Sequence, residues 1–144
     1  MPRSEYAKPG LAQHGSTLRP LRVLIVEDDK DTVLSLLMLL RSDGYEASAV
    51  GSAKAMWNTF DDFEPDVLLI DINLPDRSGY ELVRDLRLTY GDAAPRPVLI
   101  AVTGWNKGSD KILAELAGFD HHVGKPYDPT FLLALLRRVS LKSE

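Results

Sequence analysis

Short runs of aliphatic residues alternate along this chain with stretches in which apolar residues recur at helical spacing. Residues 22–27 (RVLIVE) are mainly β-branched and aliphatic, a pattern typical of a strand buried on both faces. Apolar residues then recur every three or four positions up to Gly44, and glycine is common just past a helix end. The pattern therefore predicts a strand followed by a helix.

Four more units of the same kind follow. Ser78 and Glu81 have the spacing of a capping box, which predicts that a helix begins there. Asp128 and Pro129 suit the N-cap and first position of a last helix that continues through Val139. The other predicted strands are residues 45–50, 67–70, 97–102 and 119–123, and the other predicted helices are residues 52–60 and 110–117.

Five strand-helix units predict an α/β domain with a parallel sheet, right-handed crossovers and helices on both faces. Five units fit a doubly wound sheet, whereas a barrel needs eight. In doubly wound folds, ligands bind beyond the carboxyl ends of the strands, where the strand order reverses. Functional side chains are therefore expected at the strand ends.

Length and composition allow one domain. The chain has 144 residues, of which 44% are hydrophobic, and this is enough for one core of ordinary size. Residues 1–20 lack apolar periodicity and are expected to form a flexible N-terminal tail. The domain is then expected at residues 21–141, with a short C-terminal tail at residues 142–144.

Charge and residue usage narrow the class of protein. A net charge of −4 and a pI near 5.4 disfavour a nucleic-acid partner, which would need a basic face. The absence of cysteine excludes disulfides and thiolate metal sites. No apolar run is long enough to span a bilayer and no signal peptide is recognisable, so we expect a cytoplasmic protein without membrane contact.

Polar residues stand where four of the predicted strands end. Glu27 and Asp28 follow the first strand, Asp71 the third, Thr103 the fourth, and the fifth runs to Lys125. With the strand order 2-1-3-4-5, the first and third strands are neighbours, and their acids would repel one another unless a cation is shared. Mg²⁺ prefers carboxylate and other oxygen ligands, so it fits this set.

These residue types suit phosphoryl transfer. An ionised Asp71 can attack phosphorus to form an acyl phosphate. The metal and Lys125 would offset the charge on the phosphoryl oxygens, and the Thr103 hydroxyl would donate a further hydrogen bond.

Four sequence segments carry a resemblance to a known family. VLIVEDD, LLIDINLPDRSGYEL, AVTG and GKPYDP resemble, in order, the signatures of response-regulator receiver domains, over residues 21–141. The resemblance implies a flavodoxin-like fold of five strands and five helices. It also implies a phosphohistidine donor on a histidine kinase or phosphotransfer protein, and signalling to a downstream protein. GFDHHVGKPYDP looks particularly like receivers attached to hybrid sensor kinases.

The resemblance assigns roles at the metal site. Asp71 becomes the phosphoacceptor and a metal ligand, and Asp28 a direct ligand of Mg²⁺. Glu27 would hold the metal, directly or through water. Asn73 would contribute its backbone carbonyl, and its side chain stands where the family tunes phosphoryl lifetime.

The resemblance also assigns the switch. Thr103 becomes the switch hydroxyl, Lys125 the cation that contacts the phosphoryl group, and Pro126 the residue after a cis peptide bond. The position three residues before the lysine usually holds Tyr or Phe, but here it is His122, whose imidazole can be charged near neutral pH. Trp105, two residues after Thr103, occupies a second position that tunes phosphoryl lifetime.

Two other functions remain as alternatives. A magnesium-dependent phosphatase of the haloacid-dehalogenase type also uses an aspartate nucleophile, but its general acid would fall at Asn73, which cannot transfer a proton usefully. A degenerate receiver would act by protein binding alone, which the complete set of strand-end residues argues against. A signalling domain is therefore expected rather than a turnover enzyme.

Three further site types fit less well. The acidic loop after the first strand would repel a flavin phosphate, and the glycine spacing before Lys125 does not match a P-loop. His121 and His122 are adjacent on a strand and so point to opposite faces, which disfavours a shared transition metal.

Overall fold

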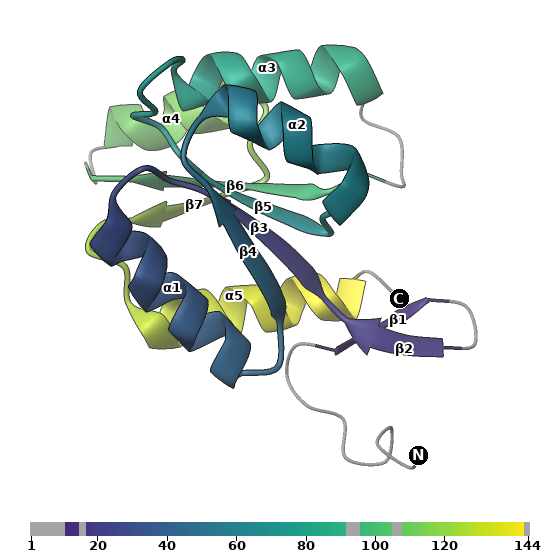
Figure 1. The fold of residues 1–144 in the computed structure, drawn as a ribbon. Helices are drawn as coiled ribbons and strands as arrows, with labels where there is room; N and C mark the ends of the chain where they lie inside the picture. Colours follow the sequence, from purple (N-terminus) through teal and green to yellow (C-terminus); the bar gives the residue numbers. More distant parts are fainter. Residues whose placement is uncertain (1–10, 15–16, 92–95, 105–107, 143–144) are drawn as a thin grey trace.

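A computed structural model describes residues 11–14, 17–91, 96–104 and 108–142 (Figure 1). The main sheet consists of β3 (Arg22–Val26), β4 (Glu46–Val50), β5 (Val67–Asp71), β6 (Val98–Thr103) and β7 (His121–Gly124). The helices are α1 (Lys30–Ser42), α2 (Ala53–Phe63), α3 (Gly79–Tyr90), α4 (Gly108–Ala117) and α5 (Pro129–Lys142). None of the described helices is long and apolar enough to cross a membrane.

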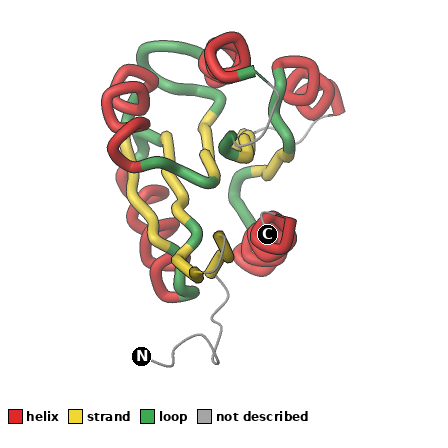
Figure 2. Tube along the Cα trace, turned by 90° about the vertical axis from the view of Figure 1, so that its right-hand side faces the viewer, coloured by secondary structure: helices red, strands yellow, loops and turns green. Residues whose placement is uncertain are grey.

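The five strands are parallel and lie in the order β4-β3-β5-β6-β7. In chain order within this sheet they are 2-1-3-4-5, so the predicted doubly wound topology is confirmed. Helices α2, α3 and α4 cover one face, and α1 and α5 cover the other (Figure 1). Figure 2 shows the strands enclosed between the two helical layers. The strand order reverses between β3 and β5, the neighbours at which the sequence predicts the site.

Each face of the sheet carries its own hydrophobic core, because alternate strand residues point to opposite faces. In β5, Val67 and Leu69 pack with the residues of α1 and α5, whereas Leu68 and Ile70 pack with those of α2, α3 and α4. All four side chains are buried. Burial on both faces explains why the strand sequences are continuous apolar runs.

Local caps explain where the helices begin. The capping box of Ser78 and Glu81 at the start of α3 is present as predicted. Asp29 caps α1 by accepting a hydrogen bond from Thr32 N, so that helix begins before its first apolar residue. Ser52 caps α2 through Ala55 N. Such caps satisfy backbone N–H groups that the helix itself leaves without acceptors.

A second, two-stranded sheet precedes the domain. β1 (Leu11–His14) and β2 (Thr17–Pro20) pair antiparallel, and Arg19 forms a two-bond ion pair with Asp66, with distances of 2.9 and 2.7 Å. The pattern of residues 1–20 did not indicate this hairpin. The flexibility expected for residues 1–20 stays a prediction, because residues 1–10 and 15–16 lie outside the described part.

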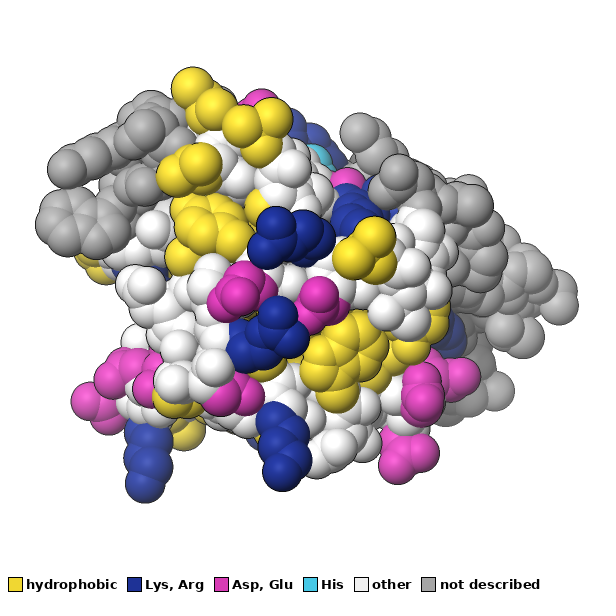
Figure 3. All heavy atoms as spheres, turned by 90° about the horizontal axis from the view of Figure 1, so that it is seen from above, with side chains coloured by type: hydrophobic (Ala, Val, Ile, Leu, Met, Phe, Trp, Pro, Cys, Tyr) yellow, Lys and Arg dark blue, Asp and Glu magenta, His cyan; other side chains and the backbone are white. Residues whose placement is uncertain are grey.

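Charges of both signs are interspersed on the face formed by α2, α3 and α4 (Figure 3). Arg77, for example, pairs with Asp85 at 2.7 Å and reaches Glu81 at 3.8 Å. Apolar side chains are exposed on the same side of the sheet, among them Leu116 of α4. A mixed charge distribution of this kind agrees with the acidic composition, and the described side chains of this face do not form a basic patch.

Asp120, the residue before β7, connects three segments of the chain through its carboxylate. It accepts a hydrogen bond from Leu99 N at 2.8 Å and pairs with Arg87 of α3 at 3.1 Å and with Arg96 at 3.0 Å. Burial alone would raise the pKa of Asp120, but these hydrogen bonds and cations outweigh it and the net pKa is lowered.

Asp120→Ala is expected to lower the free energy of unfolding by about 2–3 kcal/mol at neutral pH, because two half-buried guanidinium groups lose their counter-charge. A carboxyl with a lowered native pKa stabilises the fold above its unfolded pKa of about 3.8, and this contribution disappears as the pH falls through the lower native value. Urea unfolding should therefore show a large difference from the parent at neutral pH and a small one in strong acid. The exposed acid Asp61 gives the control: Asp61→Ala should change stability by less than about 0.5 kcal/mol. Equal effects of the two variants would contradict the assigned role.

Candidate functional site

The carboxyl ends of the strands place the predicted polar residues at one edge of the sheet. Glu27 and Asp28 follow β3, Asp71 ends β5 and Thr103 ends β6. Carboxylate oxygens of Glu27, Asp28 and Asp71 lie within 4.8 Å of one another. The structure therefore brings together the acids of the first and third strands of the main sheet, as the predicted strand order implied.

Glu27 is buried, with a relative exposure of 4%, and its carboxylate has two polar partners. Its Oε2 accepts a hydrogen bond from Asp29 N at 3.0 Å, and its Oε1 lies 2.6 Å from Lys125 Nζ. A buried carboxylate needs such partners, because burial without them is strongly unfavourable.

Lys125, which follows β7, contacts two of the acids. Its Nζ lies 3.5 Å from Asp71 Oδ2 in addition to its contact with Glu27. Its backbone N donates to Thr103 O at 2.7 Å, which joins it to the end of β6, and the Lys125–Pro126 peptide bond is cis. Burial lowers the pKa of Lys125, but the hydrogen bond to Glu27 and the charge of Asp71 outweigh it, so the pKa is raised and the ammonium stays charged.

Asp71 is 5% exposed, and its environment makes ionisation harder. Burial is the main cause that raises its pKa to about 6, and the charge of Glu27 adds to it, whereas Asn73 N and Lys125 act in the opposite direction. Asn73 N donates to Asp71 Oδ1 at 3.2 Å. An additional cation beside these acids would favour the ionised form of Asp71.

The donor set suits a hard divalent cation. Among the described residues, the three carboxylates form a group of ligand atoms that one ion can span, and Asp28 is its exposed member. The set offers oxygen and neither imidazole nor sulfur, which is the combination that Mg²⁺ favours. The residues therefore fit the predicted metal.

Gly79 lets the start of α3 approach the strand end that carries Asp71. A Cβ at this position would lie 2.8 Å from Asp71 O and 2.8 Å from Ile72 Cα, both backbone atoms that cannot swing aside. Gly79 N donates to Ile72 O at 2.7 Å. The close approach therefore sets the geometry of the loop after Asp71.

Gly79→Ala is expected to destabilise the protein by about 1–3 kcal/mol, because the added methyl group must push the helix start away from the strand. The matched control is Gly104→Ala, since a Cβ there meets nothing within 4 Å and should leave the unfolding free energy nearly unchanged. Denaturant unfolding of both variants tests this. A Gly79→Ala protein as stable as the parent would show that the helix start is free to shift.

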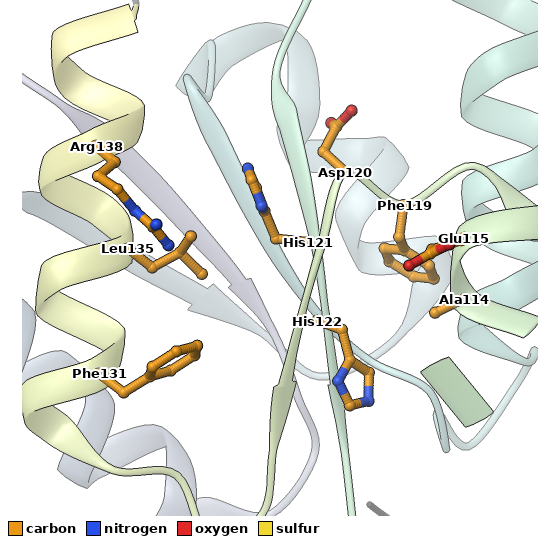
Figure 4. Close-up of a pocket in the computed structure, with 9 residues that line it drawn as sticks. All are labelled: Ala114, Glu115, Phe119, Asp120, His121, His122, Phe131, Leu135 and Arg138. Carbon is orange, nitrogen blue, oxygen red and sulfur yellow. The ribbon is translucent and has the colours of Figure 1, made fainter. Parts of the chain in front are cut away.

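His121 and His122 are the first two residues of β7. His121 is paired with Ile100 and His122 with Ala101, so they belong to opposite faces of the sheet, and Figure 4 shows their rings pointing away from each other. Both line a surface pocket of about 270 Å³ between α4 and α5. The switch role of His122 stays a prediction, and Trp105 lies outside the described residues.

Sequence reasoning missed one residue near the site. Asp76 is exposed, yet its two carboxylate oxygens accept hydrogen bonds from Ala53 N and Lys54 N at the start of α2, each at 3.0 Å. The partners lie 23 and 22 residues earlier in the chain, so no local pattern could have indicated this contact.

The chain is similar to one large family of signalling domains. A family model for the response regulator receiver domain matches residues 23–137. The sensory transduction protein RegX3 from Mycobacterium tuberculosis is 36% identical over 117 residues, which are 81% of this chain and 49% of that protein. This chain thus spans about half the length of the curated relatives it matches.

Solved structures of receiver domains are similar to this chain as well. A CheY-like response regulator receiver domain protein from Methanospirillum hungatei is 28% identical with a TM-score of 0.74, covering 85% of this chain and 94% of that one. The receiver domain of the sensor histidine kinase PA1611 from Pseudomonas aeruginosa is 26% identical with a TM-score of 0.72, covering 82% and 95%. That domain was crystallised with a magnesium ion coordinated in its active site cleft.

Proposed function

Because this chain belongs to the response regulator receiver domain family, we propose that it is the phosphoacceptor of a two-component phosphorelay, which takes a phosphoryl group onto Asp71. The family consists of signalling domains rather than turnover enzymes. The observation that carries the proposal is the position of Lys125 Nζ beside the clustered acids. It lies 2.6 Å from Glu27 Oε1 and 3.5 Å from Asp71 Oδ2. A cation placed there can meet the phosphoryl oxygens as the group arrives.

In the transfer step, an Oδ of Asp71 attacks phosphorus while the bond from phosphorus to the donor's histidine nitrogen breaks. The donor's imidazole ring, protonated on its other nitrogen, leaves as a neutral histidine, and the acyl phosphate remains on Asp71. Lys125 offsets the charge on one phosphoryl oxygen, and the Thr103 hydroxyl donates a hydrogen bond to another. The contacts of Thr103 and Lys125 with the phosphoryl group on Asp71 then start the conformational change. In this change, His122 takes the place of the usual aromatic switch residue.

Mg²⁺ would be held by Asp28 and Asp71, by Glu27 directly or through water, and by the carbonyl of Asn73. When bound, the ion neutralises charge on the carboxylates and on the transferring phosphoryl group. The oxygen-only donor set supports this choice, and so does the magnesium in the receiver domain of PA1611. Asn73 and Trp105 then tune the lifetime of the acyl phosphate.

The donor would be a histidine kinase or a histidine phosphotransfer protein in the cytoplasm, and a downstream protein would read the phosphorylated state. The acidic net charge speaks against nucleic acid as a direct partner of this domain. The chain also fits the receiver of a hybrid kinase, because the receiver domain of the sensor histidine kinase PA1611 shares this fold.

Mg²⁺ binding is expected to weaken as the pH falls below about 6, since the metal must displace the proton from Asp71, whose pKa is raised to about 6 in the metal-free protein. Above that pH, the carboxylate is already ionised and the affinity should level off. Magnesium titrations followed by amide NMR shifts across this range test the dependence. An affinity that stays constant from neutral to clearly acidic pH would show that Asp71 does not bind the metal.

The proposal is tested by adding beryllofluoride and Mg²⁺, which together mimic a phosphoryl group, and recording amide NMR spectra. We expect shifts around Asp71, Thr103 and Lys125 that are absent in Asp71→Ala. Turnover of small phosphate esters would instead favour the phosphatase. Spectra that change with neither reagent would favour a domain that acts by protein binding alone.

A further inference from the structure

Asp76 links two loops that come from different strands. It lies in the loop between β5 and α3, five residues after Asp71, and its Oδ1 and Oδ2 accept hydrogen bonds from Ala53 N and Lys54 N. These N–H groups begin α2, which follows β4. Because they lie in the first turn of a helix, where a carboxylate is also favoured by the helix dipole, both bonds are charge-assisted. The same bonds hold the pKa of Asp76 below its usual value.

The link spans the end of the strand that carries two of the acids. In the sheet, β3 lies between β4 and β5, and Glu27 and Asp28 follow β3 directly. A connection from the loop after β5 to the helix after β4 must therefore pass the end of β3. Figure 1 shows α2 and α3 on the same face of the sheet, which is the face on which this connection lies.

Both linked loops contact the backbone of the metal site. On the α2 side, a Cβ on Gly51 would lie 4.0 Å from both Glu27 O and Asp28 Cα, so this loop lies beside the backbone of the two acids. On the α3 side, Asn73 N donates to Asp71 Oδ1, and Asn73 forms a backbone bridge with Ser78 that closes the base of the loop. Asp76 therefore holds the tip of this loop against the start of α2.

We propose that Asp76 is a positioning residue for the metal site. By tying the two loops together, it keeps the backbone at Asp28 and Asn73 at the spacing that one Mg²⁺ needs. Binding of the ion then costs less conformational entropy. The inference rests on the proposed function, because it takes Mg²⁺ as the ion that these residues hold.

The test is the Mg²⁺ affinity of variants, measured by titrating MgCl₂ into the full chain and following amide NMR shifts. Asp76→Ala should weaken binding about tenfold, the lower end of the effect of removing an outer-shell group that orients a metal site. Asp76→Asn should fall between Asp76→Ala and the parent, because its amide oxygen still accepts one of the two N–H groups. The dispersion of the same spectra shows that each variant is folded.

Two controls separate positioning from charge and from helix capping. Asp31→Ala removes the same charge from an exposed site in the first turn of α1 and should change the affinity less than twofold. Ser52→Ala removes another cap of α2 but leaves the Asp76 link, and it should also have little effect. If Asp76→Ala has the same Mg²⁺ affinity as Asp31→Ala, or if Ser52→Ala loses as much Mg²⁺ affinity as Asp76→Ala, the inference is overturned but the proposed function is not. A parent chain that shows no Mg²⁺-dependent shifts would overturn the proposed function, and the inference with it.

Discussion

Asp71→Asn is expected to abolish phosphorylation by acetyl phosphate, with no modified chain detected under conditions that modify the parent. The amide oxygen carries no negative charge with which to attack phosphorus, although the side chain has the same shape and can still accept the hydrogen bond from Asn73 N. Intact mass spectrometry after incubation with Mg²⁺ and acetyl phosphate measures the effect. Residual modification at the parent rate would place the phosphoacceptor elsewhere.

The same substitution should stabilise the metal-free protein at neutral pH by on the order of 3 kcal/mol, since one pKa unit corresponds to about 1.4 kcal/mol. The native pKa of Asp71 is raised to about 6 from 3.8, so ionisation of this carboxyl opposes folding. That penalty is fully present above about pH 6 and disappears as the pH falls through the unfolded value. Urea unfolding should therefore show Asp71→Asn more stable than the parent at neutral pH and similar to it in acid, and loss of stability at neutral pH would contradict this account.

Lys125→Ala is expected to slow phosphorylation by about 10² to 10³, which is the usual effect of removing one preorganised donor to a developing anion. The ammonium contacts both Glu27 and Asp71, and no other described cation pairs with either acid. The initial rate of modification by acetyl phosphate at saturating Mg²⁺ measures this. Lys30→Ala, which removes an exposed cation at the start of α1, provides the charge-matched control and should stay within twofold of the parent. Equal rates for the two variants would remove Lys125 from the transfer step.

The elements and the strand-end residues were predictable because they depend on local patterns. Burial on both faces leaves a continuous apolar run such as residues 67–70, and the box of Ser78 and Glu81 needs only its own four residues. Once the strand order is known, parallel strands bring Asp28 and Asp71 together with no further information. The acidic site is therefore the part of the molecule that pattern and topology specify most directly.

Contacts between segments far apart in the chain were not predictable. The Asp76 link and the Asp120 cluster join residues more than 20 positions apart, and each depends on the orientation of one side chain. The pairing of Arg19 with Asp66 is of the same kind, and it accompanies a hairpin that the pattern of residues 1–20 did not indicate. Polar side chains acquire such partners only after helices pack on the sheet, so their spacing along the chain carries no signal.

The most direct measurement of the central claim is to incubate the chain with Mg²⁺ and acetyl phosphate, reduce any acyl phosphate with borohydride, and map the product by peptide mass spectrometry. The account predicts a single modified residue, Asp71, whose labelling disappears when Mg²⁺ is chelated. Labelling at another residue, or labelling of Asp71 that does not depend on Mg²⁺, would contradict it.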